Sequence, residues 1–178
     1  RSHLAVEFAD VVALRLIARR TWLYFATFVN KENHFLPPDN FQEEPEPVIA
    51  HRSSPTNFGL YLLSVVAARD FGWIGLHEMV SRLEATLDGM DALPRHHGHF
   101  LNWIDTLTLR GLEPRYVSTV DSGNLAAMLL LVAQACNEAL DRPLTQERAL
   151  AGIADEVELL RRSLALADES RGAAGVGF

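Results

Sequence analysis

The sequence predicts an all-α fold of about five helices with long loops, forming part of an (α/α)6 toroid, in which an outer ring of helices wraps an inner ring. Apolar residues recur at helical spacing in five segments, and no segment of the 178 residues has the clear pattern of a strand. Two of the five segments are apolar on nearly all faces and alternate with amphipathic ones. This alternation favours inner and outer helices over an up-down bundle, in which every helix is amphipathic.

Composition narrows the possible functions. The formal net charge of −7 argues against sequence-independent binding to nucleic acid. The longest unbroken apolar run, residues 125–133, is too short to cross a membrane, so no spanning segment is expected. The single cysteine, Cys136, lies in an apolar helical segment, where we expect a buried small side chain. The chain therefore has the profile of an ordinary globular domain without an intrachain disulfide.

A proline-rich loop separates the first two predicted helices. The first covers residues 4–31, contains no Gly or Pro, and carries an apolar stripe with its arginines off the stripe. The stripe consists of Val6, Leu14, Ile17, Phe25 and Phe28. Prolines within residues 33–53 predict an extended loop. The second helix begins after Ser54, the N-cap, with Pro55 at its first position, and ends near Asp70.

Three further helices are predicted. The third covers residues 76–90 and is amphipathic, and a second long loop follows at 94–117. The fourth covers residues 120–140 and is apolar all round, whereas the fifth, at 145–167, is amphipathic and charged. We expect residues 1–178 to form a single helical domain with a flexible tail at 168–178. Because five helices cannot close a toroid, this domain is expected to be part of a larger one.

The motif Ser-x-x-Asn/Asp-x-Gly occurs at residues 54–59 and again at 118–123, 64 residues later, each time at the start of an apolar helix. Helix capping alone explains the motif, because Asn57 and Asp121 occupy the position of a capping-box partner. The alternative is that these side chains, with Asn124 and the free amides of the helix start, bind polar groups of a ligand. The repeat would then place two helix N-termini on one side of a pocket.

Residues 99–106 combine aromatic rings, an amide and a carboxylate, and Tyr116 follows shortly after. This combination suits a sugar, because rings stack on its apolar faces while amide and carboxylate groups bind its hydroxyls. The alternative is structural: Phe100 and Trp103 anchor the loop on the core, and Asp105 caps a turn. The residues alone do not decide between the two.

Three other segments carry polar side chains. Arg52 lies just before the second helix, so it belongs either to a solvated charge run or to the edge of the same pocket. Asp39 belongs to an acidic loop that we expect to be solvated. The histidines at 96, 97 and 99 lie too close together for a good three-ligand site, and no metal is expected.

Several segments together resemble the cyclic β-1,2-glucan synthetases. They are Phe-Leu-Pro-Pro-Asp-Asn-Phe-Gln-Glu at 35–43, Ala-His-Arg-Ser-Ser-Pro-Thr-Asn-Phe-Gly-Leu-Tyr at 50–61, Ala-Ala-Arg-Asp-Phe-Gly-Trp-Ile-Gly at 67–75, Gly-His-Phe-Leu-Asn-Trp-Ile-Asp-Thr at 98–106 and Pro-Arg-Tyr-Val-Ser-Thr-Val-Asp-Ser-Gly-Asn-Leu at 114–125. The resemblance covers about residues 19–138, and the combination of motifs is highly specific.

The resemblance implies a very large bacterial inner-membrane parent enzyme that uses UDP-glucose as donor. This chain would be the N-terminal half of its glucoamylase-like (α/α)6 domain, a soluble and cytoplasmic part that elongates or cyclises β-1,2-glucan by glucosyl transfer (transglycosylation). The implied partners are β-1,2-glucan and the rest of the parent polypeptide. No cofactor is expected in this segment itself.

Departures from the family pattern bear on the site. Leu101 and Ile104 stand where the family has aromatic residues, so two sugar-stacking rings are expected to be lost, and residues 127–128 are Ala-Met where the family has Gly-His. The family's Trp-Gly-Ile-Ser-Glu motif, the expected source of the catalytic Glu, does not occur in these 178 residues, and the isolated fragment is expected to be inactive. The catalytic residue is thus unknown. Asp121 and Asp105 are the candidates, since glycosidic chemistry needs two carboxyl groups roughly 5–10 Å apart.

We predict that seven side chains contact the substrate: Arg52, Asn57, Trp103, Asp105, Tyr116, Asp121 and Asn124. Trp103 would stack on a sugar ring, while Asp105 and Asp121 would orient hydroxyls or a water. The alternative function is a non-catalytic helical module that shapes the synthetase or docks its neighbouring domains. That alternative predicts an exposed apolar surface and self-association through it. A free-standing helical ligand-binding protein is a third hypothesis.

Overall fold

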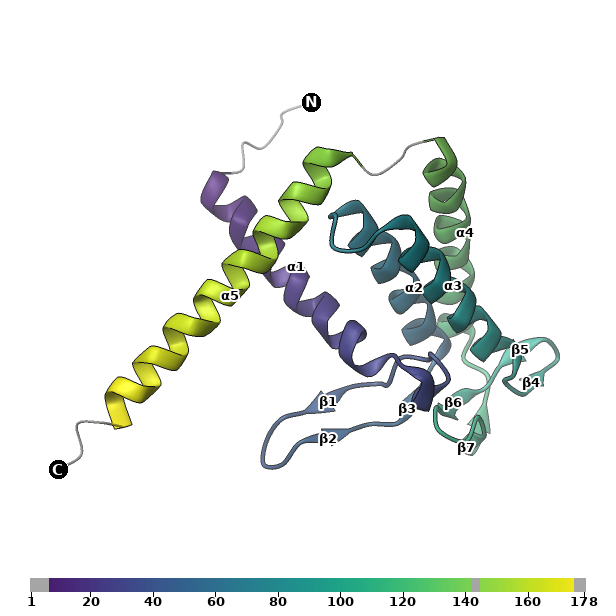
Figure 1. Ribbon diagram of the computed structural model, residues 1–178. Coiled ribbons are helices and arrows are strands. Elements are labelled where there is room, and N and C mark those ends of the chain that lie inside the picture. The colour runs from purple at the N-terminus through teal and green to yellow at the C-terminus, as the bar shows by residue number, and fades with distance from the viewer. Residues whose placement is uncertain (1–6, 142–144, 175–178) are drawn as a thin grey trace.

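The computed structural model describes residues 7–141 and 145–174, and all five predicted helices are present (Figure 1). They are α1 (Phe8–Phe28), α2 (Pro55–Asp70), α3 (Leu76–Asp91), α4 (Thr119–Asp141) and α5 (Gln146–Ala174), with a 3₁₀ turn, η1 (Lys31–Asn33), after α1. The described residues are 64% helical, so the prediction of a mainly helical fold is confirmed.

The two predicted loops contain small antiparallel sheets, so the all-α class is wrong in this respect. The described strands are β1 (Phe41–Gln42), β2 (Val48–Ile49), β3 (Arg52–Ser53), β4 (Arg95–His96), β5 (His99–Phe100), β6 (Asn102–Asp105) and β7 (Gly111–Tyr116). β1 pairs with β2 and β4 with β5, while β6 lies between β3 and β7 in a three-stranded sheet. Five of the seven described strands have only two residues, too few to show a two-residue hydrophobic period, and the six residues of β7 do not alternate between buried and exposed, so the sequence did not reveal them.

Helix α2 lies at the centre of the core. Its start matches the prediction, since Ser54 caps the helix and Pro55 occupies the first turn. Phe58 and Leu62 are fully buried, and α2 contacts α1, α3 and α4. The burial predicted from its apolar sequence is therefore largely present, although Leu63 and Val66 are only partly buried and Leu60 is 45% exposed.

Helix α4 departs from the same prediction. Leu125 and Val132 are buried, whereas Leu130 is 74% and Leu131 58% exposed. The prediction that α4 is buried all round is therefore wrong for this chain. Its packing is mainly with α2, and the opposite side of the helix faces solvent (Figure 1).

Helices α2 and α4 approach closely at Gly59. A Cβ atom at this position would overlap the side chain of Met128 on α4. A Cβ at Gly123, the matching glycine of the second motif, would meet nothing within 4 Å. The first glycine thus serves helix packing, and the second lies at an open surface.

Helix α4 is also long and apolar enough, by length and composition, to cross a membrane. Its mean hydropathy over an 18-residue window is high enough, although its unbroken apolar run is short. Within this structure, 11% of that window is buried. The expectation that no segment would qualify is corrected accordingly. Core helices of other proteins pass the same test, and in this structure α4 packs along α2.

The apolar stripe predicted for α1 faces the core only in part. Leu14 and Ile17 are each 61% exposed, while Leu16 and Trp22 are buried. The helix is rotated relative to the prediction, because the arginines beside the stripe face α5.

A buried carboxylate explains this rotation. Asp155 of α5 accepts hydrogen bonds from Nε of Arg15 at 3.0 Å, from Nη2 of Arg15 at 2.7 Å and from Nε1 of Trp73 at 2.7 Å. Arg19 forms a second ion pair with Glu156 of α5. A carboxylate is costly to bury without such partners, so α1 turns its arginines toward α5 and leaves part of its apolar stripe outside.

Helix α5 meets the turn between α2 and α3 through two glycines. A Cβ on Gly72 or on Gly152 would overlap backbone atoms of the other segment, and Gly72 adopts a φ of +84°, in the left-handed region. Helix α5 continues to Ala174, beyond the predicted end at residue 167, and residues 175–178 of the predicted tail lie outside the described residues.

We expect Gly152→Ala to lower the free energy of unfolding by roughly 1–3 kcal/mol, because the added methyl has no room against the backbone of Gly72. Gly123→Ala is the matched control, since its methyl enters open space on a helix and should stabilise by about 0.5–1 kcal/mol. Urea denaturation of both variants measures the difference. Changes of the same sign would contradict the close approach of α5.

Candidate functional site

The two Ser-x-x-Asn/Asp motifs lie at neighbouring helix starts, and both serines act as caps. Ser54 Oγ accepts from the amide of Asn57 at 3.4 Å, and Ser118 Oγ accepts from the amide of Asp121 at 3.1 Å. The capping explanation therefore holds for the serines. The side chains of Asn57 and Asp121, however, form hydrogen bonds with other elements of the fold, and capping does not explain these bonds.

Asp121 joins three elements. Thr56 Oγ1 on α2 donates to Asp121 Oδ1 at 2.5 Å, and Asn102 Nδ2 on β6 donates to Asp121 Oδ2 at 3.1 Å. Asn124 Nδ2, one helical turn along α4, donates to Thr56 Oγ1 at 3.1 Å. The starts of α2 and α4 are thus linked side by side through a half-buried carboxylate.

These hydrogen bonds control the protonation of Asp121. Burial of the carboxyl group acts to raise its pKa, but bonds from the hydroxyls of Ser118 and Thr56 and from the amide of Asn102 outweigh burial, so the pKa lies below its ordinary value. Asp121 is therefore ionised at neutral pH. Its chemistry in this setting is that of an acceptor for hydroxyl groups or for a water.

A second carboxylate organises the neighbouring surface. Asp39 Oδ2 accepts from Nε and Nη2 of Arg52 at 3.2 and 3.1 Å, and Asp39 Oδ1 accepts from Asn57 Nδ2 at 3.3 Å. The guanidinium of Arg52 also lies over the ring of Trp103, 5.2 Å from its centroid. Because Asn57 follows Thr56 in the chain, this cluster continues directly into the one around Asp121.

Asp105 occupies a different environment. Its Oδ1 accepts from the amides of Leu107 and Thr108 at 2.9 and 2.8 Å, which is the turn cap considered as the structural alternative. Burial acts to raise its pKa, but these backbone hydrogen bonds outweigh burial and lower it. In β6 the side chains of Asn102 and Ile104 are buried, while those of Trp103 and Asp105 are half-buried. Asp121 reaches β6 through Asn102, a member of the buried set.

The side chain of Tyr116 lies outside both clusters. Its backbone pairs with that of Asn102 across β6 and β7, but the residue is 47% exposed. Together with Arg95, Leu101 and Arg115 it lines an open hollow of about 600 Å³ between the β4–β5 hairpin and β7. Of the seven predicted contacts, Arg52, Asn57, Trp103, Asp121 and Asn124 are joined by the clusters, and Asp105 and Tyr116 are not.

Three residues of the network are not among the seven predicted contacts: Asp39, Thr56 and Asn102, of which Asn102 was considered only as the amide of the 99–106 segment. Asp39 was expected to be solvated, yet its side chain is only 19% exposed in its ion pair with Arg52. Each of the three falls within a family motif, which was the available signal. Asn102 Oδ1 is buried and has no hydrogen-bond partner among the described residues, so its capacity to accept a hydrogen bond is unused.

The departures at Leu101 and Ile104 differ in their effect. Ile104 is fully buried in the core, so in this structure that position offers no ring face to a sugar. Leu101 lines the open hollow beside Tyr116, where an aromatic residue would be accessible. Phe100, 8% exposed, anchors its loop on the core as the structural alternative predicts.

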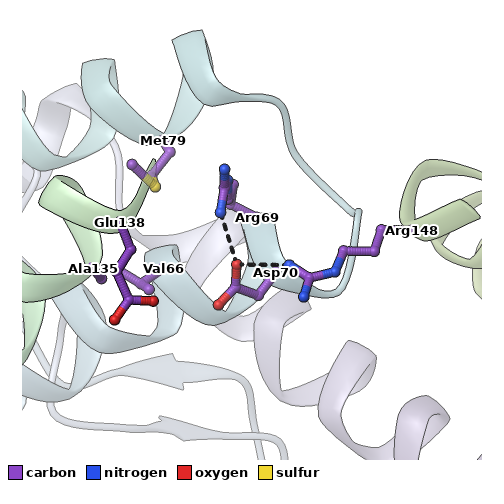
Figure 2. Close-up of a pocket in the computed structure, with 7 residues that line it drawn as sticks. All are labelled: Val66, Arg69, Asp70, Met79, Ala135, Glu138 and Arg148. Carbon is purple, nitrogen blue, oxygen red and sulfur yellow. Dashed lines mark hydrogen bonds and ion pairs between the residues drawn. The ribbon is translucent and has the colours of Figure 1, made fainter. Parts of the chain in front are cut away.

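A smaller pocket of about 90 Å³ lies at the opposite end of α2 (Figure 2). There Asp70 Oδ1 accepts from Nη1 of Arg69 at 3.0 Å and from Nη1 of Arg148 at 3.4 Å. Figure 2 shows both guanidinium groups directed at this carboxylate. The hydrogen bond from Arg148 to Asp70 therefore links the end of α2 to α5. Within residues 7–141 and 145–174, no group of three or more His, Cys, Asp and Glu side chains could hold a metal ion.

Comparison with known proteins places these motifs in context. Over 163 residues, 91% of this chain, the sequence is 51% identical to NdvB, the cyclic β-(1,2)-glucan synthase of Rhizobium meliloti strain 1021. The predicted resemblance to the cyclic β-1,2-glucan synthases is confirmed. The chain spans 6% of the length of this synthase. No protein-family model matches the chain.

Two solved structures share the fold. A candidate glucoamylase from Bacteroides fragilis NCTC 9343 superposes with a TM-score of 0.62 at 19% identity, covering 88% of this chain and 37% of that one. A second, from Bacteroides caccae ATCC 43185, gives a TM-score of 0.58 at 21% identity, covering 82% and 36%. This chain therefore has a helical fold like that of these two structures.

We expect acid to destabilise the wild-type chain more than its Asp121→Asn variant. Because the folded-state pKa of Asp121 lies below its unfolded-state value, the stabilisation is complete above the unfolded pKa, about 3.9, and is lost as the pH falls through the folded pKa. Urea denaturation from neutral pH down to about pH 3 measures the free energy of unfolding of both proteins. The difference between wild type and Asp121→Asn should narrow as the pH falls. Because Asp105 is present in both proteins, its contribution to the pH dependence cancels in the difference between them. A gap that is constant with pH would contradict the assignment.

Proposed function

We propose that this chain, within a longer parent protein, lines the β-1,2-glucan binding groove of the domain that elongates or cyclises glucan by glucosyl transfer. The observation that carries the proposal is the network of hydrogen bonds and one cation–π contact that joins five predicted substrate contacts across α2, α4, β3 and β6. The sequence identity to a cyclic β-(1,2)-glucan synthase supports the choice of glucan.

The groups in this network suit a sugar. Carboxylates and amides held by neighbouring side chains bind hydroxyl groups without having to reorganise, which lowers the cost of binding. The half-buried ring of Trp103, with Arg52 over it, offers a flat surface for a pyranose. Asp121, held ionised, orients a hydroxyl or a water and is unsuited to donate a proton. The catalytic acid is therefore sought in the rest of the parent polypeptide, and the fragment alone is inactive.

Further features of the parent belong to the same proposal. The chain forms part of an (α/α)6 toroid, completed by helices from the rest of the polypeptide. The parent is a bacterial inner-membrane enzyme that takes glucose from UDP-glucose, with this segment in a soluble, cytoplasmic domain. The coverage of only 6% of the synthase and 37% of the first glucoamylase-like structure supports a larger assembly.

A second candidate function is a non-catalytic helical module that docks neighbouring parts of the synthase. The exposed apolar side of α4, with Leu130 at 74% and Leu131 at 58% exposure, favours it. Such a module would bind no glucan through the network around Asp121.

We expect this chain to bind linear β-1,2-glucan and its Asp121→Ala variant to bind at least about tenfold more weakly. The variant loses a charged acceptor, and a hydrogen bond to a charged group contributes about 1.5–3 kcal/mol. Isothermal titration calorimetry measures both affinities. Asp88→Ala, which removes an exposed carboxylate from α3, is the control and should bind as the wild type does.

Two outcomes would decide against the proposal. Equal binding by wild type and Asp121→Ala would refute the site assignment. An absence of binding by the folded wild-type chain, with helical content unchanged, would favour the docking module.

A further inference from the structure

The outer side of α5 carries an apolar seam with coiled-coil spacing. Leu150, Ile153, Val157, Leu160 and Leu164 follow one another at steps of three and four residues, and each is more than half exposed. This is the a/d pattern of a heptad repeat, with residues 150, 157 and 164 at a and residues 153 and 160 at d. The seam, as defined by these five residues, has the form of a helix–helix interface.

The seam lies opposite the side on which α5 docks. Gly152 and Asp155, at heptad positions c and f, meet Gly72, Arg15 and Trp73, and Glu156, at position g beside the seam, pairs with Arg19 of α1. A surface helix normally turns its apolar stripe to the core. Helix α5 instead docks through small and charged residues and leaves its apolar stripe outside. Figure 1 shows α5 crossing α1 and extending beyond it, and the exposed fractions of the five seam residues show that the seam is accessible.

Charges beside the seam indicate its occupant. Glu156 stands at position g and Arg161 at position e of the next heptad. In a parallel pair of helices, g of one helix faces e of the following heptad in the other. Two parallel copies of α5 therefore place Glu156 of each copy beside Arg161 of the other, and twofold symmetry repeats the pair. An antiparallel pair loses this match.

We propose that the seam is a self-association interface, in which α5 of a second copy of this chain packs along it as a parallel, in-register two-stranded coiled coil. The seam covers little more than two heptads, so the dimer dissociates on dilution. The inference rests on α5 alone and is independent of glucan binding.

Sedimentation equilibrium of the chain over a range of concentrations tests the proposal, with circular dichroism to verify helical content. We expect a reversible monomer–dimer equilibrium. Leu160→Glu should weaken it by at least about tenfold, because the dimer would bury an unpaired charge. Leu166→Glu is the matched control on the same helix, since Leu166 is 61% exposed against 60% for Leu160 but lies off the seam, and it should leave the dissociation constant within about threefold.

Charge reversal tests the partner and its direction. Glu156→Arg and Arg161→Glu should each weaken the dimer, and the double variant should restore it. Glu156 also pairs with Arg19, but that contact stays broken in the double variant, so restoration would report the contact between copies. Glu158→Arg, which breaks a pair with Arg162 on the same helix, is the control. A double variant as weak as the single variants would overturn the parallel alignment.

A cross-link tests the register. Because Cys136 is the single cysteine of the chain, Cys136→Ala combined with Leu164→Cys places one thiol on the seam. Parallel, in-register helices bring the two copies of position 164 together, so mild oxidation should yield a disulfide-linked dimer. A chain that stays monomeric at all concentrations would overturn the proposal. A dimer abolished by Leu130→Glu on α4 but not by Leu160→Glu would do so too.

Discussion

The close packing of α2 on α4 is the constraint on which the rest of this chain depends. It requires a glycine at position 59, where the side chain of Met128 occupies the space of a Cβ. With the helices so close, their N-termini lie side by side, and Thr56 of one reaches Asp121 of the other. The polar network therefore follows from a packing contact in the core. Its geometry is set by the fold before any ligand arrives.

The sequence indicated the helices and the two helix starts well, because apolar periodicity and capping residues are local signals. Ser54 and Pro55 are an example, since their roles depend on neighbours within one turn. The strands were missed because five of the seven described ones have only two residues, and the longest, β7, shows no alternation of buried and exposed residues. The burial of α4 was overestimated, since composition states that a helix is apolar and not whether a neighbour covers it.

The candidate site was predictable to a similar extent. Side chains next to the helix starts, such as Asn57 and Asp121, could be found from their motifs. Asp39 and Asn102 could not be assigned, because their contacts depend on how distant loops fold against α2 and α4. The orientation of α1 was missed for the same reason, as its arginines respond to Asp155, which lies 140 residues from Arg15 in the chain.

Helix α5 is held differently from the other helices. Its contacts with the body include the close approach of Gly152 to Gly72, ion pairs that involve Arg15, Arg19 and Arg148, and a hydrogen bond from Trp73, while the five residues of the seam face outward. The hydrophobic effect thus contributes little to its attachment, and salt screens the exposed part of the rest. The attachment of α5 therefore depends largely on polar contacts, and ionic strength is expected to weaken the exposed ones, such as the pair between Arg148 and Asp70, before it affects the apolar core around α2.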